Sequence, residues 1–198
     1  DGPLTPAALR ELLDLARAAG VRAHFGVDFA ERRAEPSQLL IDCRGIAARD
    51  QLPGLRGVRG ERLIIATRDV TLRRPVRLLH PRHPLYVVPW TEHRFLVGAT
   101  VIESEDASPM TVRSALELLG LAYALHPAFG EAEIVDIGVG VRPAFADNVP
   151  RAVVEGSGET VHVNGAFRHG FLLAPVLAAV LRDHLAGNAG NHPLLVHR

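Results

Sequence analysis

Apolar residues recur at helical spacing in three parts of the chain. Pro6 follows Thr5, and this pair suits the first helical position after an N-cap because proline lacks the N–H that would be left without a partner there. An apolar stripe follows and ends before Gly20, a residue that suits a left-handed C-cap. The same spacing predicts a helix over 111–125 and a final helix over 171–185 that ends at Gly187.

Short runs rich in β-branched residues predict strands between these helices. Two of them, 21–27 and 38–43, are separated by a charged turn at 31–35. From residue 57 the strands follow one another closely, with turn residues between them, which favours an antiparallel sheet. The predicted strands of this part and of the later chain are 61–66, 74–79, 85–89, 94–100, 134–141 and 161–163. The pattern predicts an α+β fold in the middle, flanked by two pieces of an α/β domain.

Composition narrows the class of protein without defining its function. Of the 198 residues, 47% are hydrophobic and 22% are charged, which is typical of a soluble globular protein. Lys plus Arg and Asp plus Glu each number 22, so net charge gives no reason to expect nucleic acid or an acidic membrane as a partner. The single Cys43 cannot form an intramolecular disulfide, so a reducing, cytoplasmic compartment is expected. No stretch approaches 18 consecutive apolar residues, and a membrane span is not expected.

Three segments combine a strand with an arginine or an aromatic residue: 85–89, 138–143 and 164–175. Here the sequence resembles the D-amino-acid oxidase family, and within it the glycine oxidases of thiamine synthesis. Segments 58–61, 74–77, 97–100 and 142–150 support the likeness, which runs from residue 1 to about 187 in the family's order and spacing. The resemblance implies a substrate-binding domain with an antiparallel sheet at 57–143. It also implies an incomplete FAD-binding domain formed by 1–56 and by the returning segment 144–198.

Arg142 is the first candidate for binding a substrate. An amino acid offers a planar carboxylate, and a guanidinium group matches it with two parallel charge-assisted hydrogen bonds. Gly138 and Gly140 before it would let the backbone pass close to a flat ring. The resemblance implies that Arg142 binds the substrate carboxylate. A structural salt bridge beneath the Pro143 turn is the alternative.

Tyr86 and the turn that enters the last helix are the other candidates. Alternation points Tyr86 opposite Val87, and the resemblance implies that its phenol lines the substrate pocket; a packed aromatic residue explains it equally well. A helix N-terminus suits the electron-rich edge of a reduced flavin. The resemblance implies that Arg168 also lines the substrate site and that Val27 contacts the adenine end of FAD, although an ordinary helix cap and a core valine are the alternatives. The implied FAD contacts in the turn are Ala166, Phe167, Arg168, His169, Gly170, Phe171 and Leu172.

Other reactive residues do not form a convincing site. His80 and His83 have a His-x-x-His spacing, but no carboxylate or cysteine nearby completes a metal set. Cys43 falls in a strand that we expect to be buried with no base beside it, so an inert core thiol is the expectation. His162 and His169 are expected to be structural or surface residues.

The sequence lacks the Gly-x-Gly-x-x-Gly turn with which a FAD-binding domain holds the pyrophosphate. The family places that motif ahead of the point where this chain begins, and the first residue is not Met, so a partial or processed chain is expected. Alone it should bind FAD weakly or not at all and should expose parts of its first and last helices. A second chain that supplies the amino-terminal half, or a homo-oligomer formed by domain swapping, would resolve both problems.

The resemblance implies FAD-dependent oxidation of a small amino acid, glycine first, to an imine with release of hydrogen peroxide. A sarcosine oxidase or a D-amino-acid dehydrogenase is the alternative among enzymes. A catalytically inactive fragment without flavin, which acts by binding a partner, is the alternative from another class.

Overall fold

The computed structural model describes residues 6–27, 38–80, 84–156, 158–188 and 190–198. They form two compact units. The first unit comprises Asp1–Phe25, Arg59–Ile102 and Asp106–Gly140, and the second comprises Gly26–Val58, Glu103–Glu105 and Val141–Arg198. Two strands, β2 (Arg56–Ala66) and β6 (Glu133–Ala144), have residues in both units.

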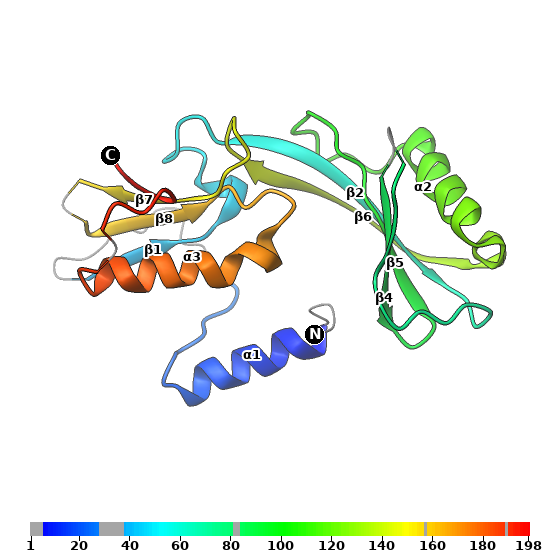
Figure 1. Ribbon diagram of the computed structural model, residues 1–198, viewed down its shortest axis with the longest axis horizontal. Helices are drawn as coiled ribbons and strands as arrows, with labels where there is room; N and C mark the ends of the chain where they lie inside the picture. Colours follow the sequence, from blue (N-terminus) through cyan, green and yellow to red (C-terminus); the bar gives the residue numbers. More distant parts are fainter. Residues whose placement is uncertain (1–5, 28–37, 81–83, 157, 189) are drawn as a thin grey trace. The chain divides into compact units, whose positions relative to one another are not determined.

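The first unit is built on a five-stranded sheet in the order β3-β4-β5-β2-β6 (Figure 1). Its remaining strands are β3 (Val76–Leu78), β4 (Leu85–Thr91) and β5 (Arg94–Gly98). The β3–β4, β4–β5 and β2–β5 pairs are antiparallel. Short connections between consecutive strands make this pairing the natural one, as the sequence predicts.

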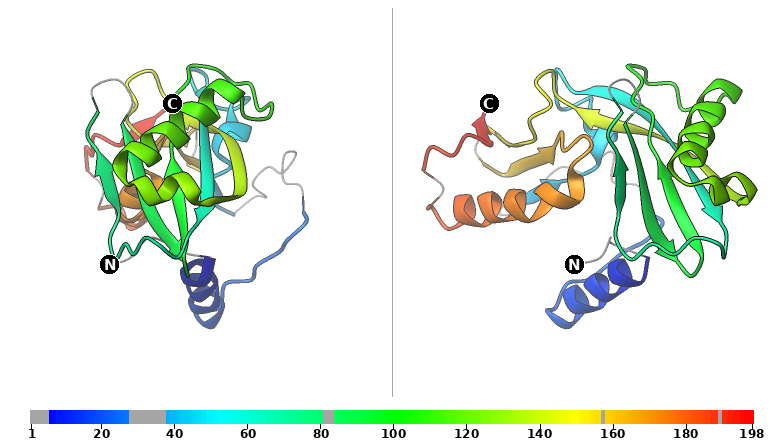
Figure 2. Two further views of the ribbon diagram at one scale, coloured as in Figure 1. Left: turned by 90° about the vertical axis from the view of Figure 1, so that its right-hand side faces the viewer. Right: turned by 45° about the vertical axis from the view of Figure 1, so that its right-hand side comes forward.

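One face of this sheet is covered by α2 (Val112–Leu125), which a short 3₁₀ helix, η2 (Pro127–Glu131), follows (Figure 2). Thr111 caps α2 by accepting a hydrogen bond from the Ser114 N–H at 3.2 Å. Alternate residues of the strands point toward the helix, so their side chains form one apolar layer. The buried members of this core include Leu63, Ile65, Leu85, Val87, Phe95, Val97, Leu118, Ala122 and Phe129.

A buried ion pair within β2, between Arg59 and Glu61, is hydrogen-bonded to the loop before α2. The Arg59 guanidinium donates to Glu61 Oε1 at 2.7 Å and to the carbonyls of Asp106 and Pro109. Thr100 donates to the other carboxylate oxygen of Glu61 at 2.9 Å. Burial by itself would raise the pKa of Glu61, but hydrogen bonds from Ser114, Arg59 and Thr100 outweigh it and hold that pKa below its ordinary value.

The second unit contains a four-stranded mixed sheet in the order β1-β8-β7-β9 (Figure 1). The strands are β1 (Leu40–Asp42), β7 (Arg151–Glu155), β8 (Thr160–Asn164) and β9 (Leu195–His197). β1 pairs with β8 in parallel, β8 with β7 antiparallel, and β7 with β9 in parallel. Parallel pairs need long crossover connections, and here other elements lie between the paired strands in the chain.

Both faces of the mixed sheet carry an apolar cluster. On one face Ala152, Val154 and Val161 pack with Leu181 of α3 (Gly170–Leu185), and Figure 1 shows this helix beside the strands. The other cluster brings the segment around η1 (Gly45–Ala48) to the sheet. Its members are Ala48, Leu52, Leu55, Phe145 and Val153. The second unit therefore has the layered form predicted for the α/β pieces.

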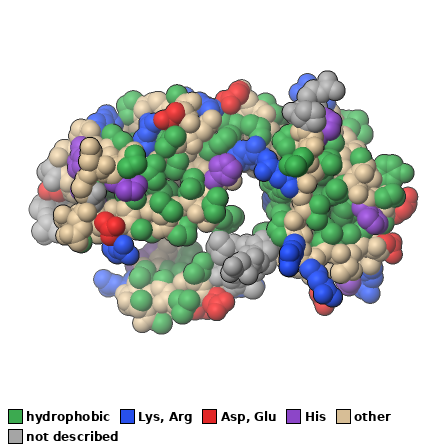
Figure 3. All heavy atoms as spheres, in the orientation of Figure 1, with side chains coloured by type: hydrophobic (Ala, Val, Ile, Leu, Met, Phe, Trp, Pro, Cys, Tyr) green, Lys and Arg blue, Asp and Glu red, His purple; other side chains and the backbone are tan. Residues whose placement is uncertain are grey.

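The first helix, α1 (Pro6–Ala18), forms where the sequence predicts it, and Gly20 has a φ of +89° as its C-cap role requires. The predicted cap residue Thr5 and the charged turn at 31–35 lie outside the described residues. Leu12 and Leu15 of α1 are more than half exposed, as are Phe171, Leu172 and Leu185 of α3, so both helices have the bare apolar faces that the sequence predicts. In Figure 3 hydrophobic side chains gather along α3.

The predicted strand over 21–27 is wrong. These residues form no regular secondary structure, and Val21, Phe25 and Val27 are all more than half exposed. The alternation of apolar and polar residues is present, but a strand needs a neighbour to accept its backbone hydrogen bonds. No described strand lies beside this segment.

Candidate functional site

A tight turn, Gly165–His169, joins β8 to α3 and carries one of the two predicted substrate arginines. Gly165 has a φ of +80° and Phe167 a φ of +48°, both in the left-handed region. A Cβ at Gly165 would lie 2.3 Å from the Phe145 ring, so only glycine fits against that ring. The His169 N–H donates to the Ala166 carbonyl at 2.9 Å and closes the turn.

The end of β6 lies against this turn. The Phe167 N–H donates to the Pro143 carbonyl at 3.1 Å. This hydrogen bond joins segments 138–143 and 164–175, which the sequence analysis singled out. Arg142 directly precedes Pro143, and Arg168 directly follows Phe167. The fold of the second unit therefore brings together the backbone around both predicted arginines, and both side chains are half-buried.

The first turn of α3 opens from the same place. His169 occupies the N-cap position and makes no side-chain capping bond, so the first N–H groups of the helix are not satisfied by a cap. Phe171 and Leu172 are 68% and 74% exposed. Exposed apolar side chains beside a helix N-terminus fit a flat ring with an electron-rich edge. This turn can therefore hold the ring end of a flavin, whereas the sequence has no cradle for a pyrophosphate.

Tyr86 belongs to the first unit. It faces away from the buried Val87 and its α2 layer, as alternation predicts, and its register partner on β5 is Gly98. A Cβ at Gly98 would lie 2.7 Å from the Tyr86 hydroxyl oxygen and 2.8 Å from Cζ. The phenol therefore lies flat over Gly98, on the sheet face opposite α2.

Val27 does not lie where the sequence analysis places it. It is 51% exposed and belongs to no strand, so neither the predicted strand position nor the alternative of a buried core valine is correct. Its proposed contact with the adenine end of FAD stays a prediction.

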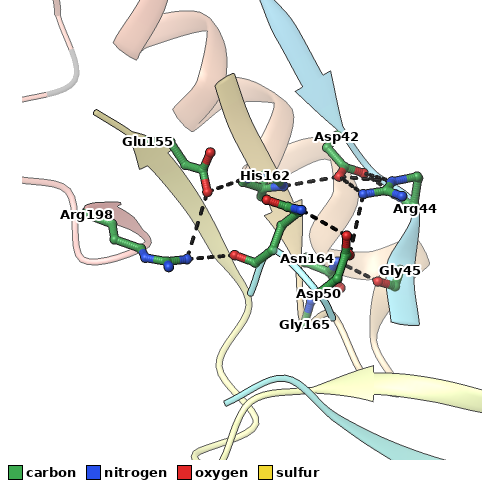
Figure 4. Close-up of polar contacts among 10 residues, drawn as sticks. Asp42, Arg44, Gly45, Asp50, Glu155, His162, Asn164, Gly165 and Arg198 are labelled. Carbon is green, nitrogen blue, oxygen red and sulfur yellow. Dashed lines mark hydrogen bonds and ion pairs between the residues drawn. The ribbon is translucent and has the colours of Figure 1, made fainter. Parts of the chain in front are cut away.

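A polar network joins β1, β8 and β7 (Figure 4). Asp42 on β1 accepts hydrogen bonds from Arg44 at 2.9–3.1 Å, and its Oδ2 lies 3.2 Å from Nδ1 of the buried His162. The other ring nitrogen of His162 lies 3.3 Å from Glu155 Oε1, without hydrogen-bond geometry. Burial would raise the pKa of Asp42, but hydrogen bonds and charge from Arg44 outweigh it and lower that pKa.

Asn164 is a residue that sequence reasoning missed. It is buried at the end of β8, directly before the turn, and its amide bonds to backbone groups on both sides (Figure 4). An asparagine between a strand and a glycine signals a turn. The sequence could not show that its second partner lies 119 residues earlier, at Gly45.

Cys43 is exposed and follows the last residue of β1, so the expectation of a buried core thiol is wrong. Desolvation and the neighbouring Asp42 charge raise the pKa of its thiol, which lowers its reactivity. His83 lies outside the described residues. Among the described residues no three His, Cys, Asp or Glu side chains are grouped to hold a metal ion, and no helix in that part is long and apolar enough to span a membrane.

Comparisons with known proteins give matches in sequence and in fold. Residues 4–184 match the family of FAD-dependent oxidoreductases. A protein of Rhizobium etli described as the thiamine biosynthesis oxidoreductase ThiO is 58% identical over 151 residues, which cover 76% of this chain and 46% of that protein. A glycine oxidase of Bacillus licheniformis is 28% identical over 132 residues, which cover 66% of this chain and 35% of that enzyme.

The fold is similar to that of a solved glycine oxidase from Bacillus cereus. The TM-score is 0.67 at 24% identity, and the match covers 79% of this chain and 44% of that enzyme. The chain thus spans about half the length, or less, of the relatives that it matches.

Proposed function

Since the chain belongs to the family of FAD-dependent oxidoreductases, we propose that it forms the substrate-facing portion of an enzyme that oxidises glycine for thiamine synthesis. The completed protein, in which this chain is joined to the amino-terminal part that its relatives carry, would convert glycine and oxygen to the imine and hydrogen peroxide. The names of the similar ThiO and glycine oxidase proteins support this substrate.

The observation that carries the proposal is the hydrogen bond between the Phe167 N–H and the Pro143 carbonyl. It joins the strand end that bears Arg142 to the turn that bears Arg168. Two arginines on backbone segments that meet beside an uncapped helix N-terminus suit a small anionic substrate beside a flat redox ring.

Each residue then has a defined task. Arg142 and Arg168, both in the second unit, bind the glycine carboxylate and fix Cα in place. Orientation supplies most of the rate, because a neutral amine needs no obligatory general base from the protein. FAD, when bound, supplies the acceptor for the Cα hydride and a route for its electrons to oxygen.

The proposal is tested by peroxide release from glycine with the completed protein. Arg142→Ala should raise the KM for glycine about a hundredfold, because two charge-assisted hydrogen bonds are lost. Arg142→Lys should recover only part of this, since an ammonium cannot bind a carboxylate in two-point fashion. Arg182→Ala, which removes an exposed arginine paired with Asp183 in the last turn of α3, is the matched control and should leave KM unchanged.

The alternatives give different outcomes in the same assay. Faster peroxide release from sarcosine or D-alanine than from glycine would favour a sarcosine oxidase or another D-amino-acid enzyme. Substrate-dependent flavin bleaching without peroxide would favour a dehydrogenase. A completed protein that stays colourless with FAD would favour an inactive, partner-binding relative.

A further inference from the structure

Asn164 is a buried polar residue that the chemistry proposed above does not use. It is 4% exposed at the carboxyl end of β8, beneath the segment that follows β1. A buried amide is costly unless its donor and acceptor are both satisfied. Its partners therefore indicate what this residue does for the fold around it.

The side chain links two backbone segments. Asn164 Nδ2 donates to the Gly45 carbonyl at 2.8 Å, and Asn164 Oδ1 accepts from the Gly165 N–H at 2.8 Å (Figure 4). Gly45 and Gly165 both have positive φ values, +63° and +80°, so each partner lies at a point where the chain bends sharply. A short amide with a donor and an acceptor can satisfy both groups together.

The turn has only a few other anchors. The described backbone bonds of its members include Phe167 N–H to Pro143, His169 N–H to Ala166 and Leu173 N–H to His169, and Phe145 packs against Gly165. None of these bonds ties the turn to η1, the segment that follows β1. The bond from Asn164 to Gly45 supplies that tie.

We propose that Asn164 is a positioning residue for the proposed site, and that it sets the placement of the Gly165–His169 turn for flavin and for the substrate carboxylate. This inference rests on the proposed function. Without the tie to Gly45 the turn would sample more conformations, and the bound geometry would be populated less often. Affinity falls in proportion to that population.

The test uses two variants of nearly the same shape in the completed protein. Asn164→Leu removes both hydrogen bonds. Asn164→Asp keeps the acceptor for Gly165 and places a carboxylate oxygen against the Gly45 carbonyl. Both should raise the dissociation constant for FAD by about tenfold and raise the KM for glycine more than they change kcat, because a hydrogen bond of ordinary strength is lost.

Hydrogen exchange separates the two bonds. The Gly165 amide should exchange faster in Asn164→Leu than in Asn164→Asp, which retains its acceptor. Val154→Ala is the control: it removes buried methyl groups from the opposite face of the same sheet and touches no residue of the turn. It should lower the melting temperature and leave the FAD affinity unchanged.

Three outcomes decide the matter. If Asn164→Leu lowers only the melting temperature, as the control does, Asn164 is structural and the inference is overturned. If both variants weaken FAD and glycine binding while Val154→Ala does not, it is supported. If the wild-type completed protein binds no FAD or oxidises no glycine, the proposed function fails; faster Gly165 exchange in Asn164→Leu than in wild type then supports the tether alone, and unchanged exchange overturns it.

Discussion

Gly98 shows how one missing side chain defines a surface. The Tyr86 phenol covers this residue so closely that a methyl group would overlap its hydroxyl and Cζ atoms. Packing therefore requires a glycine at this position, and the orientation of the Tyr86 ring depends on that glycine.

Gly98→Ala should displace the Tyr86 ring and destabilise the first unit by about 1–3 kcal/mol, the usual cost of overpacking. Urea unfolding followed by the fluorescence of Trp90, the one tryptophan of the chain, checks this from within β4. Gly120→Ala is the matched control. Its new methyl would meet nothing within 4 Å on α2, so it should stabilise by about 0.5–1 kcal/mol. Equal effects of the two changes would contradict the packing argument.

The buried Glu61 should make the first unit sensitive to acid. Its pKa is lowered in the folded state, so the stabilisation it provides is present above the ordinary value of about 4.5 and is lost as pH falls through the folded value. Glu61→Gln should remove the buried counter-charge of Arg59, which keeps the more exposed Asp106 at 3.6 Å, and should cost about 3–5 kcal/mol at neutral pH. The variant should also lose stability less steeply below pH 4.5 than the wild type, as measured by Trp90 fluorescence.

Glu103→Gln provides the comparison, because Glu103 is a largely exposed carboxylate that is ion-paired with Arg56. Its stability should stay within about 1 kcal/mol of wild type with an unchanged pH dependence. If Glu61→Gln lost stability below pH 4.5 as steeply as the wild type, Glu61 would not titrate as its hydrogen-bond network implies.

At the residue scale, the sequence predicted the side of a strand on which a residue lies better than the burial of that residue. The side of the strand on which Tyr86 lies followed from alternation alone. The exposure of Cys43 did not, because β1 ends at Asp42 and the thiol leaves the sheet. The role of Asn164 could not be predicted, because it depends on a hydrogen bond to Gly45, which is distant in the chain.

At the scale of elements, helix α3 begins after an N-cap residue, His169, whose side chain makes no capping hydrogen bond. His169→Ser should add a capping hydroxyl and stabilise the second unit of the isolated chain by about 0.5–2 kcal/mol. In the completed protein the same change should weaken FAD binding, because the serine hydroxyl would compete for the N–H groups that the flavin would use. Thermal unfolding and FAD titration measure the two effects.

Thr111→Ala on α2 is the reciprocal control. It removes a cap that the structure contains and should cost about 0.5–2 kcal/mol without any change in FAD affinity. Stronger FAD binding by His169→Ser would contradict the role given to the start of α3.

Most elements followed from periodicity, and the failures share a physical cause. All three helices and the strands of the antiparallel sheet form where the pattern predicts them, since local spacing and turn residues suffice. β9 has only three residues, too few to show alternation, and it forms because β7 accepts it. Residues 21–27 have the alternation and lack such a neighbour. Pairing, which is not local, decides both cases.

At the scale of the whole molecule, we predict that this chain alone holds FAD weakly. The turn before α3 provides the ring end of a site, and the sequence has no pyrophosphate cradle. Visible absorbance should not co-elute with the isolated chain on gel filtration after incubation with FAD, and it should do so once the amino-terminal part of the relatives is joined to it. A yellow isolated chain would contradict this prediction.

The two units are interleaved along the polypeptide. The backbone passes from one to the other at 25/26, 58/59, 102/103, 105/106 and 140/141. A premature stop codon anywhere between positions 59 and 140 would therefore deprive both units of residues. Neither unit can be cloned as an uninterrupted reading frame, and a truncation in this region removes part of both units together.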